Sequence, residues 1–119
     1  MPNSPQDFRK KVLGRNAEEL TAQYLKKQGY KVLECNYKTP YGEADIIAFK
    51  DGTYCFVEVK ARESDAFGLP TEAVDERKRA RYRKIAAYFC MMKKTEVPIR
   101  FDISSVFEGE LEYFENAFI

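Results

Sequence analysis

The spacing of apolar residues first predicts a helix near the start of the chain. Between residues 14 and 28 they recur three and four positions apart, as one face of an α-helix requires, at Ala17, Leu20, Tyr24 and Leu25. Gly29 follows and is a typical helix stop. Residues 1–13 are polar, contain two prolines and are interpreted as a flexible N-terminal arm or a short lead-in helix.

A second helix is predicted over residues 72–94. Its apolar stripe lies in the later turns, at Ile85, Tyr88, Phe89 and Met92. Thr71 is a plausible N-cap, and acidic residues in the first turns suit the helix dipole.

Alternating and apolar runs predict five strands, at residues 30–36, 43–49, 53–62, 98–107 and 111–114. The second and third are joined by Lys50-Asp51-Gly52, and Asp-Gly is a strong signal for a tight hairpin. The resulting order, α-β-β-β-α-β-β, predicts an α/β fold in which helices flank a mixed sheet. Residues 14–119 then form a single domain, which suits a chain of 119 residues.

The predicted hairpin concentrates charged residues. Pairing outward from its loop places Asp45 opposite Glu58 and Glu43 opposite Lys60. Asp45, Glu58 and Lys60 then project from one face, where two directly opposed carboxylates destabilise the sheet unless a counter-charge lies near. The pattern therefore predicts either a bound cation or ordinary solvent-exposed ion pairs.

Oxygen ligands favour a hard cation, Mg²⁺ or Mn²⁺, and the carbonyl of Val59 is positioned to join Asp45 and Glu58 as a ligand. Lys60 could orient or deprotonate a water or neutralise charge on a phosphate. Carboxylates, a metal and a lysine suit phosphodiester hydrolysis better than acyl transfer.

Composition narrows the chemistry further. The chain has no histidine, which excludes histidine-based triads and histidine-ligated zinc. Its 20 Lys and Arg residues balance 19 Asp and Glu residues, so the net charge gives no argument for nucleic acid. The three cysteines are scattered, and Cys55 and Cys90 are expected to be buried thiols. No secretory signal and no apolar run long enough to span a membrane is found, so a cytoplasmic protein is expected.

Each predicted helix carries charged residues that could serve such a site. Glu18 lies at the border of the apolar face of the first helix, whereas Glu19 lies on its polar face. Glu18 is thus expected to point along the sheet, unless it only supports the helix dipole. In the second helix six of residues 77–84 are basic, and Lys78 and Arg81 extend the core stripe. With Arg62 they could contact phosphates, or the run could be a solvated face.

The motifs together resemble the YraN-like (UPF0102) family and, through it, the PD-(D/E)xK nuclease superfamily and its archaeal Holliday-junction resolvases. The resemblance rests on motifs in order from Gly14 almost to the chain end, the most specific being Gly42-Glu43-x-Asp45-Ile46-Ile47 and Phe56-Val57-Glu58-Val59-Lys60-x-Arg62. Ala17 departs from the family, where glycine is common before the glutamate.

The resemblance implies a restriction-endonuclease-like sheet and a Mg²⁺- or Mn²⁺-dependent nuclease acting on DNA, including branched or repair intermediates. By position, Asp45 and Glu58 match the metal ligands, Lys60 the catalytic lysine and Glu18 the glutamate of the first helix, while Lys78 matches a frequent basic position. Resolvase-like relatives imply a homodimer. The alternatives are a module that binds nucleic acid or a partner on this scaffold without catalysis, and a protein-interaction domain with no nucleic-acid role.

Overall fold

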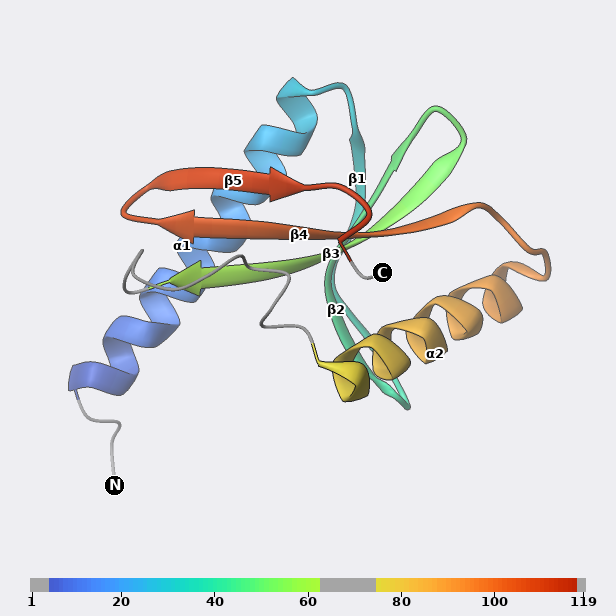
Figure 1. The fold of residues 1–119 in the computed structure, drawn as a ribbon, viewed down its shortest axis with the longest axis horizontal. Coiled ribbons are helices and arrows are strands. Elements are labelled where there is room, and N and C mark those ends of the chain that lie inside the picture. Colours follow the sequence, from blue (N-terminus) through green and yellow to red (C-terminus); the bar gives the residue numbers. More distant parts are fainter. Residues whose placement is uncertain (1–4, 63–74, 118–119) are drawn as a thin grey trace.

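The fold is described by a computed structural model that covers residues 5–62 and 75–117, with side chains from residue 16 onward. The predicted order of elements is confirmed (Figure 1). The elements are α1 (Pro5–Lys27), β1 (Lys31–Thr39), β2 (Gly42–Lys50), β3 (Thr53–Arg62), α2 (Glu76–Lys93), β4 (Ile99–Phe107) and β5 (Glu110–Phe114).

The five strands form one mixed sheet in the order β1-β2-β3-β4-β5. Neighbours are antiparallel except β3 and β4, which are parallel and are joined by the connection that contains α2. The β2–β3 hairpin has the predicted register, from Lys50 opposite Thr53 to Ile46 opposite Val57. Asp51 and Gly52 both have positive φ, 50° and 81°, as the tightest hairpin turn requires.

The two helices pack on opposite faces of the sheet, as Figure 1 shows. Successive strand residues point to opposite faces, so Phe56 packs against α2 and the next residue, Val57, belongs to the cluster that covers the α1 face. From α2 come four buried residues, Tyr82, Ile85, Ala86 and Phe89. From α1 and the turn that follows it come Leu25 and Tyr30. The central strands β2 and β3 are therefore apolar on both faces.

The helices start at other residues than the apolar spacing predicts, and for residues 5–13 the structure agrees with the lead-in helix rather than the arm. The first helix begins at Pro5 and runs through Gly14, because proline is well tolerated in the first turn and a single glycine weakens a helix without ending it. In α2 the N-cap is Asp75, whose carboxylate accepts a hydrogen bond from the Lys78 backbone N–H. The predicted cap, Thr71, lies outside the described residues.

Buried polar contacts fix the α1 face and the end of the chain to β4. The hydroxyls of Thr21 in α1 and Ser104 in β4 lie 2.7 Å apart. Asp102 is fully buried and accepts from the Arg100 guanidinium, the Tyr113 hydroxyl at 2.6 Å and the Asn116 backbone N–H at 2.8 Å. Because its charge is fully partnered, Asp102 is interpreted as structural.

Among the described residues the three cysteines are free thiols. Cys55 is buried as predicted, and burial raises its thiol pKa to about 11. Cys90 is only partly buried and Cys35 is exposed. No helix in the described ranges has the length and apolar character needed to cross a membrane.

Candidate functional site

The candidate site lies where β2 and β3 separate. In the described strands, their pairing ends at Ile46 opposite Val57. Beyond that point β2 continues beside β1, and Glu58 on β3 pairs with β4. Asp45 is the first residue of β2 past the pairing, and its Oδ2 accepts a hydrogen bond of 2.8 Å from the Val59 backbone N–H. A side chain thus takes the place of a strand-to-strand hydrogen bond.

A bend in β2 directs the Asp45 side chain into the gap between β2 and β3. Ala44 and Ile47 both pack in the cluster beneath α2, although strict alternation would place residues three apart on opposite faces. The neighbouring strand is irregular at the same level, because Asn36 has a φ of 55°. The expected direct pairing of Asp45 with Glu58 is therefore corrected by the structure: the two carboxylates are not a strand pair but interact electrostatically across the gap between the strands.

Glu58 points from β3 toward α2, on the same face as Phe56. Its Oε1 accepts a hydrogen bond of 2.8 Å from Lys78 Nζ, and its Oε2 accepts one of 2.5 Å from the Tyr82 hydroxyl. The side chain is only 15% exposed. Each carboxylate oxygen thus has a partner from α2, which fixes its orientation.

The environment of Asp45 disfavours its ionised form. Burial, and secondarily the negative charge of Glu58, raises its pKa from 3.8 to about 7. The Val59 N–H acts in the opposite direction by stabilising the carboxylate. A buried carboxylate repelled by a second one is an arrangement that a divalent cation would stabilise.

Glu18 of α1 adds a further carboxylate. We call Asp45, Glu58, Glu18 and Glu43 the acidic cluster, because the charges of the three glutamates all act on Asp45. Glu18 is half-buried while Glu19 is exposed, as the helix pattern predicted. With its amide nitrogen turned toward them, Asn36 donates to Glu18 Oε1 at 3.2 Å and to Glu43 Oε1 at 2.8 Å. Burial and the Glu43 charge raise the pKa of Glu18. Both glutamates also contribute to the raised pKa of Asp45.

Lys60 and Val59 follow Glu58 on β3. Lys60 is exposed and, two residues further along an extended strand, lies on the same face as Glu58. The N–H and C=O of one strand residue point to the same neighbouring strand. Because the Val59 N–H reaches Asp45, the Val59 carbonyl also points toward the gap.

The three predicted phosphate-binding cations have different surroundings. Lys78 reaches the acidic cluster, where it forms an ion pair with Glu58. Arg81 lies against the β1–β2 turn, so closely that a Cβ on Gly42 would be 2.7 Å from its Cδ. Arg62, at the end of β3, lies over the Phe107 ring and 3.6 Å from a Glu112 oxygen. Lys78 and Arg81 thus lean toward the sheet as expected, whereas Arg62 is held by β4 and β5.

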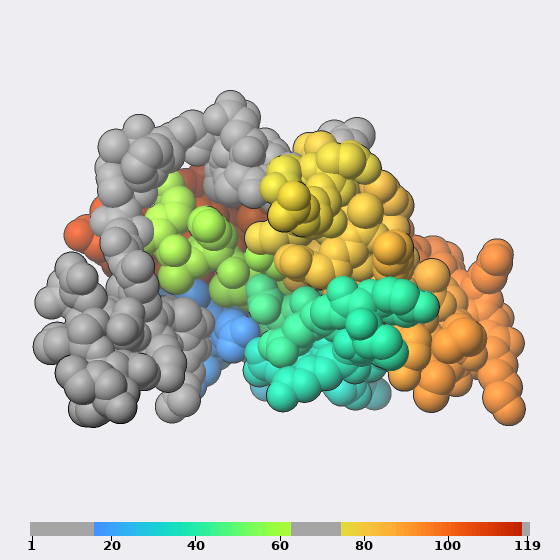
Figure 2. Space-filling view, turned by 90° about the horizontal axis from the view of Figure 1, so that it is seen from below, coloured from blue at the N-terminus to red at the C-terminus, as the bar shows by residue number. Residues whose placement is uncertain are grey.

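Figure 2 views the face on which these elements meet. The end of β3 in green, the beginning of β2 in teal, a part of α1 in blue and the start of α2 in yellow converge near its centre. These four elements carry Glu58, Asp45, Glu18 and Lys78 respectively. Residues distant in sequence therefore share one surface.

The site offers oxygen donors for a metal ion. Within residues 16–62 and 75–117, no group of three or more His, Cys, Asp or Glu side chains is arranged to hold one. Asp45 and Glu58, with the carbonyl of Val59, supply only hard oxygen donors, which suits Mg²⁺ or Mn²⁺ completed by waters. The residues fit a two-carboxylate site of this kind.

The sequence does not predict the contacts that three residues of the site make: Asn36, Glu43 and Tyr82. Tyr82 lies three residues before Ile85 on the buried stripe of α2, a signal for its burial but not for its bond to Glu58. Glu43 was expected to face Lys60 and instead shares Asn36 with Glu18. No local pattern indicates that contact, because its partners come from three different elements.

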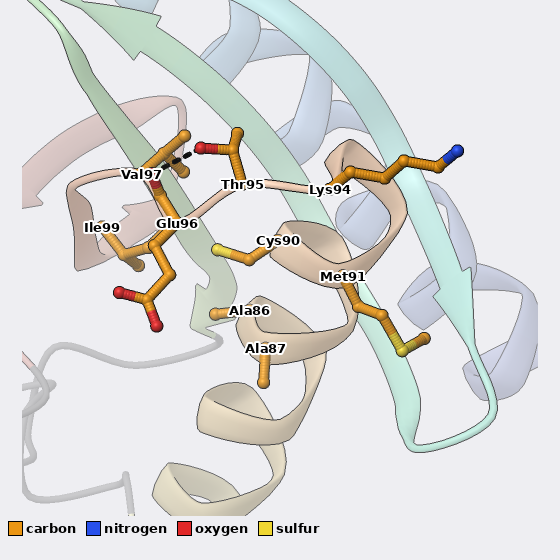
Figure 3. A pocket seen from close by; sticks show the side chains of 9 residues that line it. All are labelled: Ala86, Ala87, Cys90, Met91, Lys94, Thr95, Glu96, Val97 and Ile99. Atoms are coloured by element: carbon orange, nitrogen blue, oxygen red, sulfur yellow. Dashed lines mark hydrogen bonds between the residues drawn. The ribbon is translucent and has the colours of Figure 1, made fainter.

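A further cavity lies away from these residues, in the described part of the chain. It has a volume of about 680 Å³ and is formed by the end of α2 and the segment before β4, including Cys90, Thr95 and Val97. Figure 3 shows that Lys94 extends away from the other side chains and that the Thr95 hydroxyl bonds the Glu96 carbonyl, at 3.3 Å. Most of the side chains that line it are apolar or small, so it offers little chemistry for catalysis.

The chain is similar in sequence to a family of known proteins. Residues 17–106 match the sequence model of a family described as "Uncharacterised protein family UPF0102". A UPF0102 protein of Thermodesulfovibrio yellowstonii is 46% identical, over 89% of this chain and 95% of its own length. UPF0102 proteins of Alkaliphilus metalliredigens and Dictyoglomus thermophilum are 41% and 44% identical, each over 91% of this chain and 98% of their own. Among solved structures, "Crystal structure of SSO0001" is 15% identical with a TM-score of 0.45, covering 94% of this chain and 52% of that chain, a likeness too distant to indicate function.

Proposed function

The chain belongs to the uncharacterised protein family UPF0102, and we propose that it is a Mg²⁺-dependent nuclease that hydrolyses phosphodiester bonds in DNA. The observation that carries the proposal is the electrostatic repulsion between two carboxylates, Asp45 and Glu58, at the point where their strands part. Burial and repulsion raise the pKa of Asp45 to about 7, so the site favours an added positive charge. Branched and repair intermediates are the substrates that the resemblance to resolvases favours.

The proposed roles follow from the contacts of each residue. Asp45, Glu58 and the Val59 carbonyl hold the cation. Lys78 and Tyr82 keep Glu58 in one orientation through their hydrogen bonds. Glu18 raises the negative charge of the cluster from α1.

Lys60 is assigned the role of orienting a water or contacting a phosphate oxygen. It is exposed on the face of Glu58, where its amine can reach a phosphate oxygen or orient a water. A bound Mg²⁺ supplies Lewis-acid stabilisation of the phosphate charge. Arg81 and the exposed cations of α2 bind the phosphate backbone of the DNA.

The proposal is tested by incubating the protein with single-stranded, duplex and branched DNA while Mg²⁺ and Mn²⁺ are titrated. Wild type is expected to cleave at least one substrate only with metal, and Lys60→Ala to cleave none. Lys31→Ala is the matched control, because Lys31 is an exposed lysine at the opposite end of the sheet. Equal cleavage by wild type and Lys60→Ala would contradict the assigned mechanism.

One observation favours a second candidate, a nucleic-acid-binding module without catalysis. Lys78 already neutralises Glu58, at 2.8 Å, so this carboxylate has a counter-charge from the protein itself. Such a module would bind DNA with strong salt dependence and without any strengthening by Mg²⁺. Absence of cleavage on every substrate, together with a melting temperature that no divalent ion changes, would support it over the nuclease.

A further inference from the structure

A small cavity on the outer side of α2 lies apart from the acidic cluster. Its volume is about 230 Å³, and it is lined by Tyr41 of the β1–β2 turn and by Lys84, Ala87, Tyr88 and Met91 of α2. We call these five residues the aromatic notch. Tyr41 is 51% exposed and Met91 63%, so two large, mainly apolar side chains of one notch are open to solvent.

The two tyrosines of the notch form an open aromatic corner. Their ring centroids are 6.4 Å apart and the rings are nearly perpendicular, at 72°. This edge-to-face contact leaves a face of Tyr41 available to a further ring. The volume is below that of typical drug-sized pockets, so the notch suits one ring system rather than a whole small molecule.

The turn that carries Tyr41 is held rigidly. The Thr39 hydroxyl accepts from the Tyr41 backbone N–H at 3.0 Å and donates to the Gly42 carbonyl at 2.9 Å. Gly42 has a φ of 133°, and the Arg81 side chain lies directly against it. Little conformational freedom of the turn therefore has to be lost when a ligand binds.

A basic stripe connects the notch with the acidic cluster. Steps of four and three residues place the following side chains on one face of α2: Arg77, Arg81, Lys84, Tyr88 and Met91. Between Lys78, which contacts Glu58, and Tyr88 the helix rises about 15 Å. This equals the axial length of roughly four stacked nucleotides at about 3.4 Å each.

We propose that the aromatic notch stacks one unpaired nucleobase of a DNA strand whose backbone follows the basic stripe to the acidic cluster. The proposal rests on the proposed function, since it takes the substrate to be DNA, and it adds that the substrate is single-stranded near the cut. A base in a duplex cannot stack on Tyr41 because its faces are covered by its neighbours.

Charge favours a nucleic acid over a second copy of this chain. In a two-fold dimer the same patch meets itself, so the cations of the stripe would face the same cations. A phosphate backbone is instead complementary in charge to the three cations of the stripe, Arg77, Arg81 and Lys84. The notch therefore combines the two features of single-strand binding sites, a cationic track and an aromatic stacking surface.

The test measures binding of fluorescein-labelled 12-nucleotide single strands by anisotropy in EDTA, where metal-dependent cleavage cannot occur. Tyr41→Ala is expected to weaken binding about tenfold, a typical loss for one base stack, while Tyr41→Phe keeps wild-type affinity. Met92→Ala is the matched control, because Met92 is a large apolar side chain of α2 that is also mostly exposed, at 60%, but is not among the residues that line the notch.

Strands that carry one abasic position, moved along the sequence, locate the stacked base. One position should weaken wild type about tenfold and leave Tyr41→Ala unchanged. Lys84→Ala should lower the salt dependence of binding by about one phosphate contact. Affinity of Tyr41→Ala within twofold of wild type would overturn the notch proposal, as would self-association of wild type that Tyr41→Ala abolishes.

Cleavage assays separate this proposal from the nuclease itself. If wild type cuts DNA but Tyr41→Ala binds normally, only the notch fails. If no DNA is cut but binding depends on Tyr41 as described, the notch stands and the catalytic role of Asp45 and Glu58 fails.

Discussion

Replacing Asp45 by asparagine should stabilise the metal-free protein. At pH 8 the Asp45 carboxylate is ionised, although it is mostly buried and is repelled by the charge of Glu58. Asparagine has nearly the same shape, carries no charge, and its carbonyl oxygen can still accept the hydrogen bond from Val59. Asp45→Asn thus removes the unfavourable charge and keeps the contact that fixes the side chain.

The size of this stabilisation follows from the pKa of Asp45. In the folded chain it is raised to about 7 from an unfolded value of 3.8, so the folded state binds the proton more tightly. The free energy of unfolding therefore falls as pH rises from about 4 to 7, by up to about 4 kcal/mol for a shift of three units. Since water reaches part of the site, about half of this, roughly 2 kcal/mol, is expected.

The assay is urea unfolding of wild type and Asp45→Asn in EDTA at pH 5 and pH 8. The stability advantage of the variant should widen by about 1–2 kcal/mol between the two pH values. Glu19→Gln is the control, because it removes an exposed carboxylate from α1 and should show the same stability as wild type at both pH values. A variant that is less stable than wild type, or an advantage that does not change with pH, would refute the reasoning.

Three further substitutions test the contacts around the site and the fold. Lys78→Ala should destabilise the chain by about 1–3 kcal/mol in urea unfolding, because it leaves a largely buried Glu58 without its ion pair. Tyr113→Phe should cost about 1–2 kcal/mol in the same measurement, since the buried Asp102 loses a hydrogen bond of 2.6 Å. Gly42→Ala should lower the melting temperature, at a cost of about 1–3 kcal/mol, because a side chain at φ 133° is strained and would collide with an arginine of α2.

The fold could be predicted from the sequence wherever a local pattern determines it. The Asp51-Gly52 turn has the backbone angles that this dipeptide favours, and its register correctly predicted the pairing from Lys50 to Ile46. The prediction failed at Asp45, where β2 bends away from β3. At that point Ala44 packs beneath α2, a tertiary contact that no hairpin rule contains.

Parts of the candidate site were predictable for the same reason. Helical periodicity separated the half-buried Glu18 from the exposed Glu19, and it directed Lys78 toward the sheet. Periodicity gives the direction of a side chain but not its partner. The bond of Lys78 to Glu58 joins residues 20 positions apart, and Asn36 joins two glutamates from different elements, so both depend on how α1 and α2 dock.

The most direct test of a metal-dependent site at Asp45 and Glu58 is cleavage of single-stranded and branched DNA by wild type and Asp45→Asn in a Mn²⁺ titration. We predict that wild type cuts DNA with increasing metal and that Asp45→Asn, although more stable, cuts none. Cleavage by Asp45→Asn at the wild-type rate would contradict the account.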